Sequence, residues 1–324
     1  MRAMVYNRYG PPDVLHLKEI ERPVPKDNEL LVKIEASSVN AVDWHFMRGS
    51  PVLVRLQYGM FRPKNTVLGY DFAGRIEQVG GNVTQFKPGD EVFGGLGFGL
   101  GGFSEYACIP ENAFVSTKPP TVGFEQAAAV PGAAVAALIG LRHRGRVQPG
   151  QRVLINGSAG GTGTFAVQIA KACGAEVTAV CSTRNVEMVR RLGADHVVDY
   201  RQEDFTRTGE TYDLLLDNVG NRRVPDMVRA LRDGGTVVIV GFTNMRLMLQ
   251  QSILGPRAAK ARNITWSKPA SAEPSRDHAD ALKELLESGT IIPEIEKVYP
   301  LEELPEAMRL IETGHARAKI VITL

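Results

Sequence analysis

Residues 152–164 read RVLINGSAGGTGT, an apolar segment that runs directly into a cluster of glycines. The apolar part predicts a strand, and the pattern over residues 164–173 predicts a helix. Because a helix N-terminus presents N–H groups and a positive dipole end, this strand–turn–helix predicts a binding site for a dinucleotide pyrophosphate. A purely structural turn is the alternative. The predicted cofactor-binding turn consists of Gly157, Ser158, Ala159, Gly160, Gly161, Thr162 and Gly163.

Strand and helix patterns alternate on both sides of this turn, between about residues 121 and 241. Segments such as VLIN, VTAVC and VVIV are apolar throughout, as expected of parallel strands that helices cover on both faces. The alternation predicts a doubly wound α/β domain, the Rossmann architecture. The predicted strands are Arg152–Asn156, Glu176–Cys181, His196–Tyr200, Asp213–Asn218 and Thr236–Gly241, and the predicted helices are Thr164–Cys173, Asn185–Leu192 and Arg222–Arg232.

The regions that flank this domain have a different sequence pattern. Residues 1 to about 120 contain short β patterns separated by Gly and Pro, which predict a compact, barrel-like β domain. Residues 242–276 show no clear pattern except a short strand at Asn263–Ser267. The tail then predicts a helix, a strand, a helix and a final strand.

The end of the second Rossmann strand bears on the choice between NADH and NADPH. An NAD site usually has an acidic residue there to bind the ribose 2′-hydroxyl. This strand ends in Cys181, and Ser182 and Arg184 follow. Both side chains suit a 2′-phosphate, so the sequence predicts NADPH as the cofactor. The alternative is that Arg184 only solvates the next helix.

Composition excludes several classes of function. The chain has 324 residues, enough for two domains, and a net charge of +2 without a basic stripe, which argues against nucleic acid as a partner. No apolar run is long enough to span a bilayer, and the N-terminus does not read as a signal peptide, so we expect the protein in the cytoplasm. Its three cysteines form no C-x-x-C pair.

Motifs along the whole chain resemble the medium-chain dehydrogenase/reductase superfamily, and within it the zinc-free quinone oxidoreductase group. The resemblance implies a GroES-like catalytic domain made from residues 1–120 and 267–324, with a Rossmann domain, residues 121–266, inserted between them. The motifs that carry it are SSVNAVDW (37–44), LGYDFAG (68–74), VG (79–80), FKPGDEV (86–92), AAAVP (127–131), the glycine turn, AKA (170–172), LGAD (192–195) and GHAR (314–317).

The resemblance also implies roles for single residues. Asn40 and Tyr70 are the predicted catalytic positions, and Arg184 and Tyr200 fall near the adenosine 2′-phosphate and ribose. Tyr200 as an ordinary core aromatic, and Asn218 as an ordinary turn residue, are the alternatives. The remaining predicted cofactor contacts are Asn218, Val219, Gly220, Gly241, Phe242 and Arg317.

We predict no metal in the site. Zinc-dependent relatives carry Cys at the position of Asn40 and His at that of Tyr70, and an amide and a phenol are poor zinc ligands by comparison. Within the zinc-free group, Val135 stands where a Thr near the nicotinamide is usual, and Ala318 replaces a Gly of the tail motif.

These features together predict NADPH-dependent hydride transfer to a quinone or an α,β-unsaturated carbonyl, with a hydrogen bond from Asn40 to the carbonyl oxygen. Tyr58 and Tyr70 are candidate proton donors.

The alternatives to this function are an alcohol dehydrogenase, zinc-type or zinc-free, and a NADPH-binding protein without turnover. The loop over residues 94–102, with six glycines, is either a mobile rim of the substrate site or a linker. The predicted partner is a small-molecule carbonyl or quinone substrate. The resemblance further implies a homodimer, in which Asn263–Ser267 pairs with the same strand of a second copy. A strand covered by its own chain is the alternative.

Overall fold

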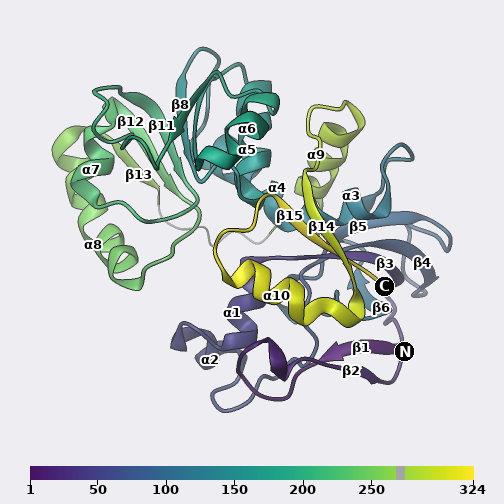
Figure 1. The fold of residues 1–324 in the computed structure, drawn as a ribbon. Helices are drawn as coiled ribbons and strands as arrows, with labels where there is room; N and C mark the ends of the chain where they lie inside the picture. The colour runs from purple at the N-terminus through teal and green to yellow at the C-terminus, as the bar shows by residue number, and fades with distance from the viewer. Residues whose placement is uncertain (268–273) are drawn as a thin grey trace. The chain divides into compact units, whose positions relative to one another are not determined.

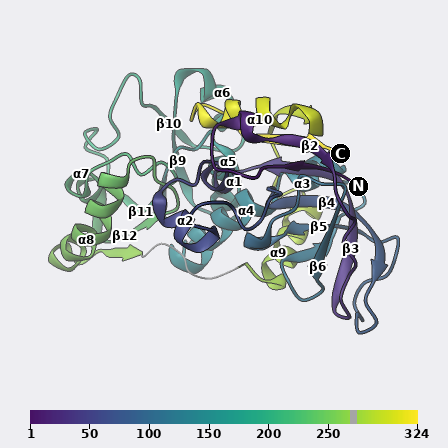
Figure 2. The same cartoon turned by 90° about the horizontal axis from the view of Figure 1, so that it is seen from below.

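The computed structural model describes residues 1–267 and 274–324, which form two compact units (Figures 1 and 2). The first unit consists of Met1–Val135, Pro274–Gly289 and Pro293–Leu324, and the second of Ala136–Glu273 and Thr290–Ile292. The first unit extends past residue 120, where the sequence predicted the first domain to end, because α3 (Phe124–Ala128) contacts β3 and β4.

The second unit is built on a six-stranded parallel sheet with the order β10-β9-β8-β11-β12-β13. The chain adds strands first on one side of β8 and then on the other, so the topology switches between β8 and β11. Ligands of doubly wound sheets bind at the carboxyl ends of the strands beside this switch point. The strands are β8 (Arg152–Asn156), β9 (Glu176–Cys181), β10 (His196–Asp199), β11 (Tyr212–Asp217), β12 (Leu231–Ile239) and β13 (Thr265–Ser267).

Four helices of the second unit follow these strands, as the sequence pattern predicted for the first three. The fourth, α8, was not predicted, and it is the longest helix among the described residues, with 18 residues. A core of apolar side chains that includes Leu154, Leu215 and Val237 is buried within the unit. The helices are α5 (Gly161–Ala172), α6 (Val186–Arg191), α7 (Val224–Arg229) and α8 (Met245–Arg262).

The first unit contains a seven-stranded sheet with the order β14-β15-β3-β4-β5-β7, in which β6 also pairs with β3. Its pairs are antiparallel except β14 with β15, which is parallel. A separate hairpin is formed by β1 and β2. The strands are β1 (Arg2–Val5), β2 (His16–Glu19), β3 (Glu29–Val39), β4 (Asp71–Val79), β5 (Glu91–Gly95), β6 (Tyr106–Pro110), β7 (Val115–Thr117), β14 (Ile295–Pro300) and β15 (Lys319–Thr323).

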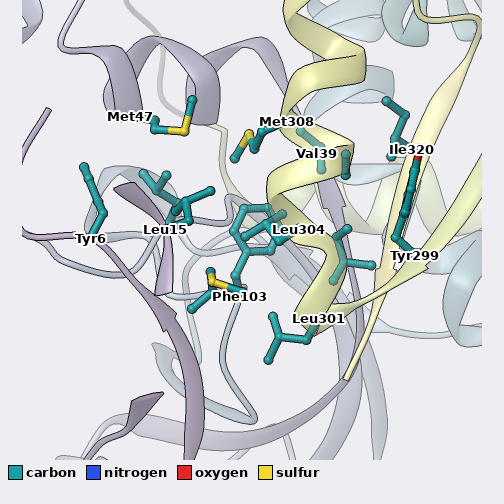
Figure 3. Close-up of a cluster of buried hydrophobic side chains, with 14 of the residues drawn as sticks. Tyr6, Leu15, Val39, Met47, Phe103, Tyr299, Leu301, Leu304, Met308 and Ile320 are labelled. Atoms are coloured by element: carbon teal, nitrogen blue, oxygen red, sulfur yellow. The ribbon is translucent and has the colours of Figure 1, made fainter. Parts of the chain in front are cut away.

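Helix α10 anchors one core of this unit. Figure 3 shows its Leu304 and Met308 beside Phe103 and Ile320, all of them buried. Each such side chain contributes about 1.5–3 kcal/mol when it leaves water. The other helices with residues in this unit are α1 (Ala41–Arg48), α2 (Val52–Tyr58), α4 (Pro131–Leu138) and α9 (Arg276–Glu287), and α10 spans Leu304–Glu312. Among the described residues, no helix is both long and apolar enough to cross a membrane.

Candidate functional site

The predicted glycine turn connects β8 to α5 in the second unit. Helix α5 begins at Gly161, three residues before the predicted start, and its N-cap Gly160 makes no side-chain hydrogen bond. The first turn of the helix therefore presents its N–H groups without a side-chain cap, as a bound pyrophosphate requires. Gly157 has a φ of 78°, and a Cβ on Gly163 would lie 2.1 Å from the Gly157 carbonyl oxygen. Both glycines are thus required by the backbone path.

A second turn at the same sheet edge follows β11, and Asp217 shapes it. One carboxylate oxygen of this buried residue accepts hydrogen bonds from the Asn156 side chain at 2.8 Å and from the backbone N–H groups of Val219 and Gly220, both at 3.0 Å. Burial raises the pKa of Asp217, and these hydrogen bonds act in the opposite direction. Asp217 therefore fixes the positions of the three residues that follow it.

The Asn218 side chain is left with unused hydrogen-bonding capacity in this turn. Its Nδ2 and Oδ1 are both buried, and neither has a partner among the described residues. A buried amide without partners costs free energy that a polar ligand would recover. Gly241 lies against the same turn, since a Cβ there would be 2.3 Å from the Asn218 carbonyl oxygen. A Cβ on Gly220 would be 2.7 Å from Phe242 Cα. The structure thus brings these predicted cofactor residues together, and they fit a dinucleotide.

The end of β9 carries the residues predicted to select the cofactor. Ser182 is buried and accepts a hydrogen bond from Asn185 at 3.1 Å, whereas Arg184 is exposed. Tyr200 is also 46% exposed, which makes the alternative of a core aromatic wrong. A surface pocket of about 590 Å³ lies beside these residues, lined by Thr183, Val186, Arg190, Val197, Asp199, Gln202 and Glu203.

Asp199 is a carboxylate in this region that the sequence prediction did not consider. It ends β10 and pairs in register with Cys181, so it lies beside the end of the second strand. Its oxygens accept hydrogen bonds from the Thr183 hydroxyl at 2.6 Å and from the Gln202 amide at 2.9 Å. The bond from Thr183 is the main cause that lowers the pKa of Asp199, so the group is charged at neutral pH.

A buried polar cluster in the first unit contains Asn40. Lys319, on the final strand, is only 3% exposed and donates to Asn40 Oδ1 at 2.7 Å and to Asp71 Oδ2 at 3.2 Å. Asn40 in turn donates from Nδ2 to Asp71 Oδ2 at 2.8 Å and to the Ser38 carbonyl oxygen at 3.3 Å. Asp71 also accepts from the Gly132 N–H at 2.7 Å and from the Ser38 hydroxyl. The cluster therefore holds the Asn40 amide in one orientation.

Two further residues of the same motifs surround this cluster. Asp43 accepts hydrogen bonds from the backbone N–H groups of Asn40 at 2.8 Å and Gly69 at 3.0 Å. Burial raises the pKa of Asp43 to about 7, against the effect of the N–H donor of Asn40. Tyr70 is buried, and its ring lies so close to Gly95 that a Cβ there would be 2.6 Å from Tyr70 Cε1. The first two glycines of the predicted loop, Gly94 and Gly95, thus belong to strand β5, and Gly95 makes room for this tyrosine.

Comparison with known proteins assigns the family. Residues 26–120 match the model "Alcohol dehydrogenase GroES-like domain", and residues 192–322 match the model "Zinc-binding dehydrogenase". The human mitochondrial NAD(P)H oxidoreductase RTN4IP1 is 34% identical over 100% of this chain and 89% of its own length. The chain belongs to the medium-chain dehydrogenase/reductase superfamily, in its quinone oxidoreductase-like group.

Two other members of the superfamily show its range. The 2-methylene-furan-3-one reductase of Solanum lycopersicum is 32% identical over 99% of this chain and 79% of its own length. The solved structure of the quinone oxidoreductase from Coxiella burnetii aligns with a TM-score of 0.87 and 29% identity, covering 100% of this chain and 99% of that one. The fold predicted from the resemblance, a GroES-like domain with a Rossmann domain, is confirmed.

Zinc, which one of the matching family models names, does not fit this medium-chain dehydrogenase/reductase at the position of Asn40. The Asn40 amide oxygen and the Asp71 carboxylate there both accept hydrogen bonds from the ammonium group of Lys319. This lysine occupies the place that a metal cation would need. Among the described residues, no three His, Cys, Asp or Glu side chains are grouped to hold a metal ion. Zinc prefers thiolate, imidazole and carboxylate ligands, and the donors present are an amide and a carboxylate bound to lysine.

Not all predicted residues of this family member come together within one unit. Asn40, Tyr70 and Arg317 belong to the first unit, and the other predicted cofactor residues belong to the second. The Arg317 backbone N–H donates to Glu296 at 2.6 Å.

Sequence reasoning missed Asp199, Asp217 and Lys319. An acidic residue directly before the Asn218 turn, and a single lysine in an otherwise apolar strand, were signals for the last two.

Proposed function

We propose that this protein is an NADPH-dependent oxidoreductase that transfers hydride to quinones or α,β-unsaturated carbonyls without a metal. The observation that carries the proposal is the uncapped turn before α5. At the same sheet edge lies the Asn218 amide, which has no partner among the described residues. The proposal is supported by the relatives named NAD(P)H oxidoreductase, quinone oxidoreductase and 2-methylene-furan-3-one reductase. A bound nicotinamide supplies the hydride.

The residues of the chain divide the remaining tasks. In this proposal the backbone N–H groups of the turn over residues 157–163 bind the pyrophosphate, and the Asn218 amide binds a polar group of the cofactor. Asn40 donates a hydrogen bond to the carbonyl oxygen of the acceptor. Its contact with the Ser38 carbonyl oxygen, at 3.3 Å, is the longer of its two Nδ2 hydrogen bonds and is the one a substrate would replace.

The proposed substrate class follows from the group that would face the carbonyl oxygen, which is the Asn40 amide and not a metal ion. Without a Lewis acid, an isolated carbonyl or an alkoxide receives little stabilisation. A quinone or an enone needs less stabilisation from the protein, because its own conjugated system spreads the incoming negative charge. A neutral amide donor such as Asn40 is then sufficient to favour the reduced product.

A panel of acceptors tests this function. We expect the pure protein to oxidise NADPH with quinones and enones, at rates unchanged by exhaustive chelation, and to oxidise simple alcohols with NADP⁺ poorly. The same assays on the chelated protein resupplied with zinc are the control. Oxidation of simple alcohols without any quinone or enone reduction, or a rate restored by zinc, would contradict the proposal. Tight NADPH binding without turnover of any acceptor would favour a binding protein instead.

Cofactor preference gives a separate prediction. We expect Arg184→Ala to weaken NADPH binding by about 1.5–3 kcal/mol, the range for a hydrogen bond to a charged group, and to leave NADH binding nearly unchanged. Isothermal titration calorimetry measures both affinities. Asp199→Asn is the matched variant, because it removes a negative charge beside the same strand end and should strengthen NADPH binding. Equal affinity of the unmodified protein for the two cofactors would show the preference to be wrong.

We also retain the homodimer and the cytoplasmic location as proposals. Strand β13 pairs with β12 and forms one edge of the six-stranded sheet, and no other described strand pairs with its outer side, where a second copy would pair. Symmetric pairing is a common way to cover such an edge.

A further inference from the structure

Apolar side chains gather on the surface of the first unit, on α2 and the loop that follows it. Val52, Leu53 and Leu56 lie on one face of the helix and are each more than half exposed. Met60 and Phe61 continue the patch, and the Phe61 side chain is 90% exposed. Single exposed apolar residues are normal, but a cluster of five on one segment indicates an interaction surface.

The charge on this segment is entirely positive. Between Asp43 and Asp71 the sequence has no acidic residue, and it has four lysines and arginines. Arg48 pairs with Glu312, and Arg55 lies over the Tyr9 ring and donates to the Gly49 carbonyl oxygen. Arg62 and Lys64 are exposed, and neither side chain has a partner among the described residues.

A pocket next to the patch adds further cationic groups. It has a volume of about 360 Å³ and is lined by Asn7, Arg8, Val14, His16 and Arg62. Within the described part of the chain, Arg8 and His16 also have no side-chain partner, while the nearby Asp13 is bound by Arg309 at 2.5 Å. The segment that carries Arg8 is bound to the segment that carries the patch, because the hydroxyl of Tyr9 donates to the Gly59 carbonyl oxygen at 2.7 Å.

Pocket and patch are continuous, since Arg62 directly follows Phe61. This arrangement has the two parts of an interfacial membrane site: cations that bind phosphate and apolar side chains that enter the acyl boundary. We propose that this face of the first unit binds the surface of a membrane that contains anionic phospholipid. Arg8 and Arg62 hold the lipid phosphate, and Leu53, Leu56 and Phe61 insert beside the acyl chains.

Other occupants match these groups less well. A second copy of the same face would place like charges against each other, since the segment has no acidic residue to pair with them. A nucleic acid would use the arginines but would leave five exposed apolar side chains without a partner. The proposal goes beyond the proposed catalytic function, and it is tested by binding alone.

Vesicle flotation tests the proposal with the full chain. We expect the protein to float with vesicles of equimolar phosphatidylcholine and phosphatidylglycerol, much less with phosphatidylcholine alone, and less at high salt. Each cation near such a surface is worth about a five-fold change in partitioning. The double variant Arg8→Glu/Arg62→Glu removes two cations and should therefore lose about 25-fold or more. Leu53→Ser/Phe61→Ser should also lose binding strongly.

Matched variants elsewhere on the first unit serve as controls. Lys87→Glu changes an exposed cation and Val24→Ser an apolar side chain that is 80% exposed, and both should float like the unmodified protein. Thermal melting checks that every variant is folded. The proposal is overturned if the protein does not float with anionic vesicles or if patch and control variants float equally. It is also overturned if light scattering shows self-association that Leu53→Ser/Phe61→Ser abolishes, which would assign the patch to a second copy.

Discussion

Lys319→Met is expected to lower the free energy of unfolding by about 3–5 kcal/mol, the usual cost of removing one partner of a buried ion pair. Lys319 and Asp71 are 3% and 0% exposed, so the variant would leave the Asp71 carboxylate buried without its counter-ion. Asn40 Oδ1 would lose its donor at the same time. Urea denaturation at neutral pH, followed by circular dichroism, measures the change.

Two further variants show whether the buried charge is the cause. Arg75→Met removes one partner of the ion pair with Glu91, whose side chains are 49% and 31% exposed, and should have a far smaller effect. Lys319→Met combined with Asp71→Asn removes both charges and should recover much of the lost stability. A loss of similar size in Arg75→Met, or no recovery in the double variant, would contradict the role given to this pair.

Gly163→Ala is expected to damage both folding and cofactor binding. The added Cβ would lie 2.1 Å from the Gly157 carbonyl oxygen and 2.6 Å from Ser158 Cα, and these backbone atoms can move only if the whole turn moves. Overpacking of this kind typically costs about 1–3 kcal/mol of stability. We also expect NADPH affinity to fall by at least about ten-fold, which corresponds to about 1.4 kcal/mol. Thermal melting and calorimetry measure the two effects.

Gly160→Ala is the matched variant in the same turn. A Cβ there would meet only the Gly157 carbonyl oxygen, at 3.7 Å, an ordinary contact, so the fold should be retained. NADPH binding should still weaken, because the methyl group occupies space that the pyrophosphate needs above the N-cap of α5. Unchanged NADPH affinity in both variants would show that the cofactor does not bind at this turn.

The sequence predicted the second unit well where local pattern is sufficient. Strands β8 and β9 have the predicted bounds, because each has an apolar centre and is flanked by Gly or a polar turn. Helix α8 was missed because Gly255 and Pro256, which usually end helices, lie inside it. The reason for the glycine is tertiary: a Cβ at Gly255 would lie 2.2 Å from the Trp266 ring.

The candidate site was predictable only in part, for a similar reason. The glycine turn is local in sequence, so strand, turn and helix could be read together. The Lys319–Asp71 pair joins residues 248 positions apart, and no local pattern connects them. Asp199 is likewise adjacent to the end of β9 only through the parallel register of β10. Residue pairs that lie far apart in the sequence and are brought together by strand pairing are therefore the part of the site that a single sequence does not predict.

The position of β15 has a consequence for the order of events on the ribosome. This strand lies between β14 and β3 inside the seven-stranded sheet, yet it is synthesised after every residue of the second unit. At about 5–20 residues per second, the nascent first unit waits many seconds for the strand that completes its sheet. Until then the last part of β3, residues 36–39, lacks the neighbour on that side, and an unpaired strand edge is a site of aggregation. The second unit is complete earlier, so the order of folding during translation is the reverse of the order in which the two units begin.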